Sequence, residues 1–261
     1  MSDTPAGYRQ RLFTAVVDAL RDDEAIRAVG EGGAAARGRA DAYSDLDLVI
    51  VAPLAHADAV FGRVESAIAA VARITHRWCV EPPGFANMAQ CFYFLDGAPR
   101  YFAVDCSILT PEGVVPFTER ERHGEAVVGF DREGVLRPRD ADAALLARRR
   151  AQRLAQLQGA SPVYSMLVAK ELARGHALEA YGFYQVLLRA LIELLGMQHR
   201  PDRFDFNWRY VDRELPAAAQ ALIARHAFVA GEEALSGLTE SLSREIAALL
   251  AALVSGTAPT G

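Results

Sequence analysis

Residues 32–51, GGAAARGRADAYSDLDLVIV, combine a glycine turn, a pair of aspartates and an apolar run. The run Leu46–Ala52 is wholly apolar apart from one aspartate and ends at Pro53, which predicts a buried strand. Strand side chains alternate, so Asp45 and Asp47 share one face and the leucines share the other. The stretch therefore predicts a strand that buries one side and presents two carboxylates on the other.

Two carboxylates a few ångströms apart repel each other unless a cation, a proton or solvent relieves the charge. Mg²⁺ is a suitable cation, because it binds one or two carboxylates together with substrate phosphates. The alternation of Arg100–Leu109 places Asp105 on the face opposite its apolar neighbours. If the two strands are neighbours, Asp45, Asp47 and Asp105 converge and can hold two metal ions for phosphoryl transfer.

The glycine turn supplies a second feature of a phosphate site. Gly32 and Gly33 have no Cβ, so their backbone amides can approach an anion closely. A short helix that begins near Ala34 would direct its N-terminus at the same anion. We therefore expect the turn to bind a phosphate group beside the two aspartates.

Periodicity and turn residues predict the other elements of the first half of the chain. Spacings of three and four predict helices, whereas apolar runs between turn residues predict strands. The expected helices are Phe13–Leu20 and Ala57–Ala72, and the expected strands are Ala25–Val29, Ile74–Val80, Cys91–Leu95, Arg100–Leu109, Ala126–Phe130 and Gly134–Leu136. Asp96-Gly97 predicts a hairpin between two of these strands.

The pattern changes near Pro138, beyond which almost every stretch has helical periodicity. The expected helices are 141–158, 162–174, 176–196, 216–229 and 231–254, separated by glycine or proline. We therefore predict an α+β protein. A mixed-sheet domain over residues 1–138 would be followed by an antiparallel helical bundle over residues 139–261, both of ordinary domain size.

Composition narrows the function classes. The chain of 261 residues has a formal charge of −5 and 51% hydrophobic residues, which excludes disorder over most of its length. The acidic balance argues against a nucleic-acid partner, since such proteins neutralise phosphates with basic residues, and it suits a small or cationic substrate. Met1–Gln10 lacks the apolar segment of a signal peptide and no run is long enough to span a bilayer, which predicts a cytoplasmic protein.

Cys79, Cys91 and Cys106 form an odd set without CxxC spacing. We expect reduced, partly buried thiols, as is usual in a cytosolic protein. Neither the cysteines nor the six histidines have the spacing of a zinc site.

The motifs together resemble the polymerase-beta-like nucleotidyltransferase superfamily. Gly33-Ala34 is followed eleven residues after Ala34 by Asp45-Leu46-Asp47-Leu48, and the neighbours Ala36-Arg37-Gly38 and Tyr43-Ser44 are similar to those of its small prokaryotic members. The family pattern adds an acidic residue on a later strand, which Val104-Asp105-Cys106 fits. More loosely, Lys170–Gly175 and the next apolar helix resemble the C-terminal bundle of antibiotic nucleotidyltransferases that act on lincosamides and aminoglycosides.

The resemblance implies transfer of a nucleoside monophosphate from an NTP, with ATP expected, to a hydroxyl of a small molecule such as an antibiotic. Pyrophosphate would be released in a cleft between the two domains. Asp45, Asp47 and Asp105 would bind two Mg²⁺ ions, and the nucleotide would be bound by Gly32, Gly33, Ala34, Ser44 and Lys170. The usual family serine is Ala34 here, which removes a hydrogen bond of about 1–3 kcal/mol and retains the amides.

Three further features each allow two interpretations. Lys170, the only lysine, continues an apolar stripe, and it either extends to solvent at the helix end or reaches the triphosphate. The aromatic and polar segment Arg203–Tyr210 either lines a pocket for the acceptor or base, or packs its rings on the bundle. Glu81 is either an acidic cleft residue or an ordinary residue at a strand end.

Two other function classes stay open. One is a protein-modifying nucleotidyltransferase of a toxin–antitoxin pair, although such proteins resemble the first half alone and the helical half counts against it. The other is a non-catalytic nucleotide-binding module, which alanine at position 34 allows. The acceptor, the preferred base and a homodimeric state are left open by the sequence.

Overall fold

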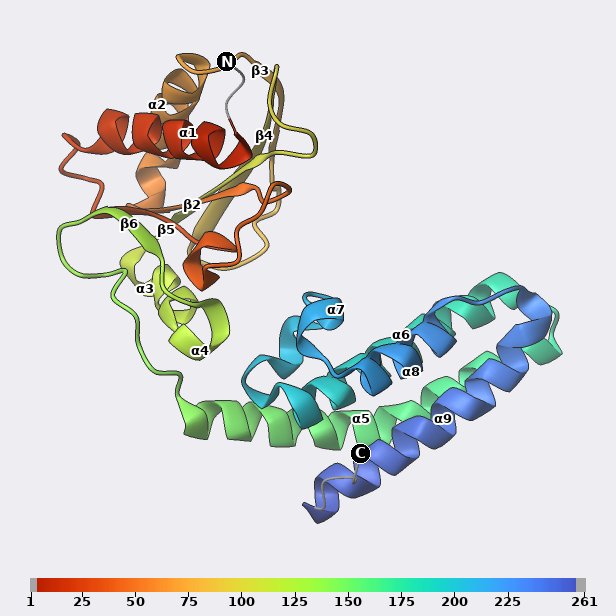
Figure 1. Ribbon diagram of the computed structural model, residues 1–261. Coiled ribbons are helices and arrows are strands. Elements are labelled where there is room, and N and C mark those ends of the chain that lie inside the picture. The colour runs from red at the N-terminus through yellow and green to blue at the C-terminus, as the bar shows by residue number, and fades with distance from the viewer. Residues whose placement is uncertain (1–3, 257–261) are drawn as a thin grey trace. The chain divides into compact units, whose positions relative to one another are not determined.

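The structure is a computed structural model that describes residues 4–256. The chain divides into two compact units, and the boundary along the sequence lies between Ala141 and Asp142. Unit 1 joins helices to a six-stranded mixed sheet and unit 2 is helical, so the predicted α+β class is confirmed (Figure 1). Among the described helices there is none with the length and apolar character needed to cross a membrane.

Unit 1 contains six strands, four α-helices and three short 3-10 helices among the described residues. The strands are β1 (Ala28–Glu31), β2 (Leu46–Val51), β3 (Ile74–Cys79), β4 (Met88–Leu95), β5 (Val104–Leu109) and β6 (Val127–Asp131). The helices are α1 (Pro5–Leu20), η1 (Ala35–Arg37), η2 (Leu54–His56), α2 (Ala57–Ala69), α3 (Pro111–Val114), η3 (Val115–Thr118) and α4 (Arg120–His123).

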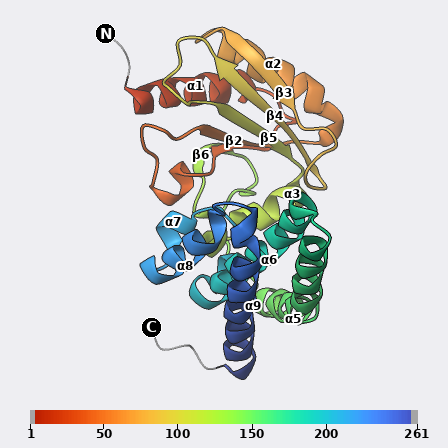
Figure 2. The ribbon, with the colours of Figure 1, turned by 90° about the vertical axis from the view of Figure 1, so that its right-hand side faces the viewer.

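The sheet has the strand order β3-β4-β5-β2-β1-β6. β2 and β5 are parallel, and every other neighbouring pair is antiparallel. α1 and α2 lie side by side on one face (Figure 2). That face holds the main core, to which β2 contributes Leu46, Leu48 and Ile50 and β5 contributes Val104, Cys106 and Ile108.

A small apolar cluster lies at one end of the opposite face of the sheet. Val51, Met88 and Leu109 from three neighbouring strands meet Val114 of α3 and Leu136 there. Val51 and Leu109 are the last residues of β2 and β5, so this cluster covers the carboxyl ends of the parallel pair. Asp47 and Asp105 lie on the same face near the amino ends of these strands.

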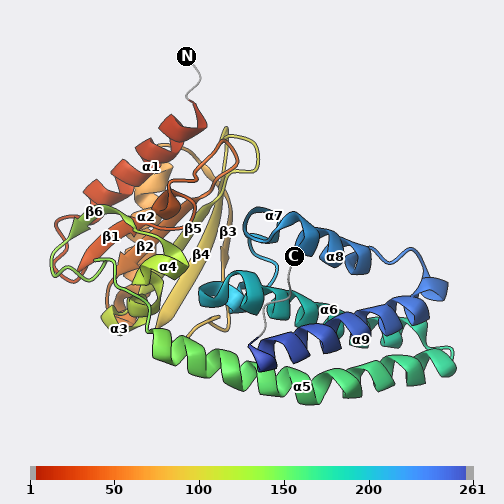
Figure 3. The same ribbon diagram turned by 60° about the horizontal axis from the view of Figure 1, so that its bottom comes forward.

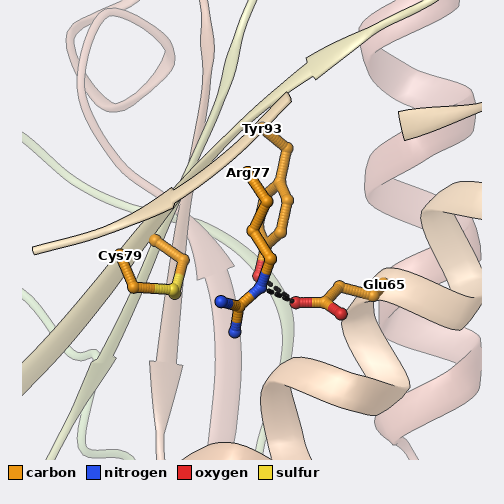
Figure 4. Close-up of a disulfide and its surroundings, with 5 residues drawn as sticks. Glu65, Arg77, Cys79 and Tyr93 are labelled. Carbon is orange, nitrogen blue, oxygen red and sulfur yellow. Dashed lines mark hydrogen bonds and ion pairs between the residues drawn. A yellow bond between two sulfur atoms is a disulfide. The ribbon is translucent and has the colours of Figure 1, made fainter. Parts of the chain in front are cut away.

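The cysteine prediction was wrong for two of the three residues. Cys79 and Cys91 oppose each other directly in the antiparallel pair β3–β4 and form a disulfide, and only Cys106 is a free buried thiol. Close to the disulfide, Arg77 and Tyr93 both donate hydrogen bonds to the Glu65 carboxylate of α2, at 2.7 and 3.1 Å (Figure 4). The spacing of twelve residues could not reveal this pairing, because it depends on strand register.

Unit 2 is built from α5 (Ala143–Ala173), α6 (Ala177–His199), η4 (Pro201–Phe206), α7 (Val211–Glu214), α8 (Ala217–Ala227) and α9 (Glu232–Ser255). Helices α5, α6 and α9 pack along one another (Figure 3). The predicted break near Gly159 was wrong, because α5 runs on through Pro162. Leu157 and Val168, on either side of the proline, are buried in the core of unit 2. This packing outweighs the backbone hydrogen bond that is lost because proline has no N–H.

Three other boundaries differ from the predictions. α1 begins at Pro5 rather than Phe13, because Thr4 caps it by accepting the Gly7 amide at 3.2 Å. The expected strand Gly134–Leu136 is a turn, in which the Asp131 carboxylate accepts two later amides at 2.9 Å. The strand predicted to end at Val29 continues to Glu31, directly before the glycine turn.

Candidate functional site

Asp47 and Asp105 are directly paired residues on the parallel strands β2 and β5. Both are half-buried, whereas Leu46 and Leu48 on one strand and Val104 on the other are fully buried on the opposite face. The sequence predicted that Asp47 and Asp105 would converge only if their strands were neighbours. β2 and β5 are neighbours in the sheet. Neighbouring strands are about 4.8 Å apart, so one small cation can reach both positions.

Asp45 precedes β2 and is fixed by the chain that enters β5. Its Oδ1 accepts the amide of Ala103 at 2.8 Å, and the Leu46 amide donates to the carbonyl of Ala103 at 3.0 Å. Partial desolvation raises the pKa of the Asp45 carboxyl, while the Ala103 amide acts in the opposite direction. A nearby cation would favour the charged carboxylate and lower this pKa.

The glycine turn packs directly on the Asp47 carboxylate. A Cβ at Gly33 would lie 1.8 Å from Asp47 Oδ2, and Gly33 has a φ of +54°, so glycine is required there on two grounds. The Gly32 amide donates to the Asp47 carbonyl at 2.8 Å and therefore holds the turn against β2. Within residues 4–256 the amides of Gly33 and Ala34 donate no hydrogen bond, which leaves two N–H groups beside Asp47 for an anion.

The segment after the turn is held by contacts far along the chain. The carbonyl of Ala36 in η1 accepts the Glu125 amide at 2.8 Å, and the Arg37 guanidinium donates to the carbonyls of Glu121 and Arg122. The hydroxyl of Ser44 accepts the amide of Asp41 and donates to its carboxylate, both at 2.9 Å. Ser44 therefore shapes the loop before Asp45, and its expected role in nucleotide binding stays a prediction.

The three carboxylates do not yet converge on one point. Asp47 is directed toward Gly33 on the β1 side, and Asp105 Oδ1 accepts the Gln90 amide of β4 at 2.7 Å on the other side. Within the described chain, the group of three potential ligands within 4.8 Å of one another is Glu171, His176 and Glu179 instead. The three aspartates would have to lie closer together than they do here to share one metal ion.

Gln90 and the Arg9–Glu31 pair are site residues that the sequence did not reveal. Gln90 lay outside the predicted strand, which was expected to begin at Cys91, so its face could not be assigned. Glu31 is buried at the end of β1, where burial raises its pKa and Arg9 of α1, 2.9 Å away, opposes the shift. This pair ties α1 to the strand that carries the glycine turn.

Lys170 lies near the end of α5, where its Nζ is 3.8 Å from Glu171 Oε1. Glu171 is buried and also contacts Arg174 and His176, each at 3.0 Å, and its pKa is lowered chiefly by the His176 hydrogen bond. Lys170 is thus part of a charged cluster within unit 2. Its expected contact with a triphosphate stays a prediction.

The segment Arg203–Tyr210 is organised by a buried arginine. Arg200 donates to the carbonyls of Asn207 and Arg209, at 2.5 and 2.6 Å, and lies 3.4 Å from the buried Glu214. Asn207 has a φ of 50°, and the cavity of about 380 Å³ beside it is lined from α5 and α6. Hydrogen bonds from Arg200 therefore hold the backbone of this segment in place.

Glu81, the other residue with two interpretations, is exposed in a turn of unit 1.

No protein-family model matches this chain, and no curated protein is similar enough to it to count as a match. The chemistry of the site therefore has to be inferred from its geometry. Two carboxylates on paired parallel strands, a third at the strand entry and two available amides can together bind a hard cation and a phosphate.

Proposed function

We propose that this protein is a magnesium-dependent nucleotidyltransferase. The observation that carries the proposal is the direct pairing of Asp47 with Asp105, with the backbone of Gly33 packed on the Asp47 carboxylate. In this proposal the aspartates would bind the cation and the glycine turn beside them would bind the phosphate, which is the adjacency that nucleotide transfer requires. A mixed-sheet catalytic domain followed by a helical-bundle domain belongs to the same proposal.

In the proposed reaction the hydroxyl oxygen of an acceptor attacks the α-phosphorus of ATP. A new oxygen–phosphorus bond forms, the bond from the α-phosphorus to the bridging oxygen breaks, and pyrophosphate leaves. The hydroxyl proton passes to the Asp105 carboxylate and then to solvent. The amides of Gly33 and Ala34 orient the phosphate chain during this exchange.

Asp45, Asp47 and Asp105 would hold the magnesium. The donor set fits the ion, because it consists of carboxylate oxygens, exposed at Asp45 and half-buried at Asp47 and Asp105, near the amino ends of the two central strands. When bound, the metal neutralises the negative charge that develops on the phosphate oxygens. The Gln90 side-chain amide, which donates to Asp105 Oδ1, would orient this carboxylate.

The acceptor in this proposal is a small molecule with a hydroxyl group. The net charge of −5 disfavours a nucleic-acid acceptor, and the resemblance to antibiotic nucleotidyltransferases favours a compound of that size. Alanine at position 34 favours one competing function, a module that binds nucleotides without transferring them. That module would bind ATP and release no pyrophosphate.

The test is a transfer assay with labelled ATP, GTP, CTP and UTP against a panel of antibiotics and cell metabolites. We expect magnesium-dependent pyrophosphate release and a labelled small-molecule product, both lost in Asp47→Asn. Label on protein instead would indicate the toxin–antitoxin class. Nucleotide binding without pyrophosphate release, in the presence of the whole panel, would contradict the proposed reaction.

A further inference from the structure

A row of aromatic side chains crosses the face of the sheet that carries Asp47 and Asp105. Trp78 of β3 stacks on Phe92 of β4, with ring centroids 5.5 Å apart, and His76 stacks on Phe94 in the same way at 5.3 Å. We call these four residues the aromatic row. Trp78 is 55% exposed and Phe94 51% exposed, which is unusual for rings of this size on a sheet.

Strand register fixes where the aromatic row lies relative to the carboxylates. Trp78 pairs with Phe92, and Phe92 pairs with Asp105. Asp105 in turn pairs with Asp47, whose far side is covered by Gly33. The order across this face of the sheet is therefore aromatic row, carboxylates, glycine turn.

This order determines which substrate can occupy the aromatic row. In an in-line displacement the attacking and leaving oxygens lie on opposite sides of the phosphorus. The phosphate chain of the nucleotide belongs at the glycine turn, where the Gly33 and Ala34 amides are available. The attacking hydroxyl must then approach from the side of Asp105 that faces β4 and β3.

We propose that the aromatic row is the platform on which the acceptor lies, with its hydroxyl directed at Asp105. This inference rests on the proposed nucleotidyltransferase function and specifies its second substrate. Trp78 and Asp105 are two strand spacings apart, about 10 Å, which a compound of two rings spans. Ring stacking on Trp78 and Phe94 would hold one ring, and the other would carry the reacting hydroxyl.

The chemistry of the row indicates the class of acceptor. The outward side chains of β3 and β4 in this region are His76, Trp78, Gln90, Phe92 and Phe94, and none of them carries a fixed charge. A phosphorylated or carboxylated compound would find no cation among these five residues. The platform therefore fits a hydroxylated compound with a flat, uncharged ring face, such as a glycoside with an aromatic substituent.

Fluorescence of Trp78 tests this inference directly. The chain has two tryptophans, so in Trp208→Phe the emission reports Trp78 alone. The probe is phenyl β-D-glucopyranoside, titrated into the full chain, with glucose 6-phosphate as the charged comparison. We expect the phenyl glucoside to change Trp78 emission in a saturable manner and glucose 6-phosphate to leave it unchanged.

Variants on the Trp208→Phe background locate the binding site. Phe94→Leu should weaken binding of the phenyl glucoside about fivefold, the effect of one lost ring contact. The matched control is Phe228→Leu, which removes an exposed ring from unit 2 and should leave binding unchanged. Equal affinity in Phe94→Leu and the parent would overturn the proposal.

Two further results would also overturn it. If acrylamide fails to quench Trp78 in the full chain, another part of the chain covers the row. If quenching decreases as protein concentration rises, a second copy covers it. ATP titration with Mg²⁺ on the same protein keeps the two proposals apart: binding of ATP without binding of the glucoside refutes the platform alone, and the reverse refutes the nucleotide site alone.

Discussion

The candidate-site carboxylates of unit 1 and the buried Glu214 carboxylate of unit 2 are held in different ways. In unit 1, Asp45 accepts a backbone amide and Asp105 accepts the side-chain amide of Gln90. In unit 2, Glu214 lies 3.1 Å from the guanidinium of Arg203 and 3.4 Å from that of Arg200, with a side chain only 4% exposed. Both arrangements position a carboxylate, but the hydrogen-bond donors are neutral amides in unit 1 and charged guanidinium groups in unit 2.

Under the proposed function, the unit 1 carboxylates bind a metal ion and the Glu214 carboxylate stabilises the fold. A neutral amide orients a carboxylate without cancelling its charge, so the charge can still attract a cation. A buried arginine neutralises its partner, and loss of either one leaves the other buried without compensation. Changes at the unit 1 carboxylates should therefore alter activity, whereas changes at Glu214 should alter stability.

The largest expected effect is on catalysis. Asp45→Asn and Asp47→Asn should each reduce the transfer rate by about 10²–10³-fold, because the metal loses a charged ligand in the transition state. The melting temperature should change little, since asparagine keeps an acceptor for the Ala103 amide at position 45. Steady-state kinetics with melting curves measure both, and transfer at the wild-type rate would remove these residues from the site.

The matching change in unit 2 is Glu214→Gln. It should destabilise the chain by about 3 kcal/mol, because Arg200 is left buried without its anion. Urea unfolding provides the measurement, and Glu245→Gln is the control, since its pairing with Arg225 is more exposed and should contribute less than about 1 kcal/mol. Similar losses of unfolding free energy in both variants would show that burial of the ion pair does not determine its contribution to stability.

Substitution of two glycines with positive φ distinguishes the effect of backbone strain from the effect of a displaced Asp47 carboxylate. Gly33→Ala introduces a Cβ at the Asp47 carboxylate, whereas Gly38→Ala, at a φ of 61°, meets nothing within 4 Å. Both should lose about 1–2 kcal/mol of stability from the left-handed backbone. Only Gly33→Ala should slow transfer, by about 10²-fold, through displacement of Asp47. Equal rates in the two variants would mean that contact with Gly33 does not position the carboxylate.

Lys170 gives the smallest expected effect. If Lys170 contacts the triphosphate, Lys170→Ala should weaken ATP binding about tenfold and Lys170→Arg should restore part of the loss, since an ammonium acts as a compact point charge. The melting temperature without nucleotide should stay close to that of the wild type, because the lysine is exposed and 3.8 Å from Glu171. Calorimetry that finds wild-type affinity in Lys170→Ala would assign the lysine to the Glu171 cluster alone.

Sequence patterns predicted the strands of unit 1 well where one face is buried. The alternation around Asp47 and Asp105 placed both on the face opposite the core, because every second residue of β2 and β5 is apolar. Met88-Ala89-Gln90 lacks that contrast, so the start of β4 and the role of Gln90 were missed. Local propensity also failed at Pro162, where packing on both sides of the proline sustains one long helix.

What the sequence could not provide is register and side-chain orientation. The disulfide between Cys79 and Cys91 depends on which residues of β3 and β4 oppose each other. The directions of Asp47 and Asp105 depend on contacts with Gly33 and Gln90, which come from other strands. Both properties arise from long-range pairing, which spacing along the chain does not specify.

The most direct test of the carboxylate site is a calorimetric titration of ATP into the full chain, with Mg²⁺ and with EDTA. Asp105→Asn is titrated beside the wild type, and Asp96→Asn, an exposed aspartate paired with Arg73, is the control. We predict saturable binding in Mg²⁺ that is lost in EDTA and about tenfold weaker in Asp105→Asn. Equal binding with and without Mg²⁺, or equal affinity in Asp105→Asn and the wild type, would contradict a metal site at these aspartates.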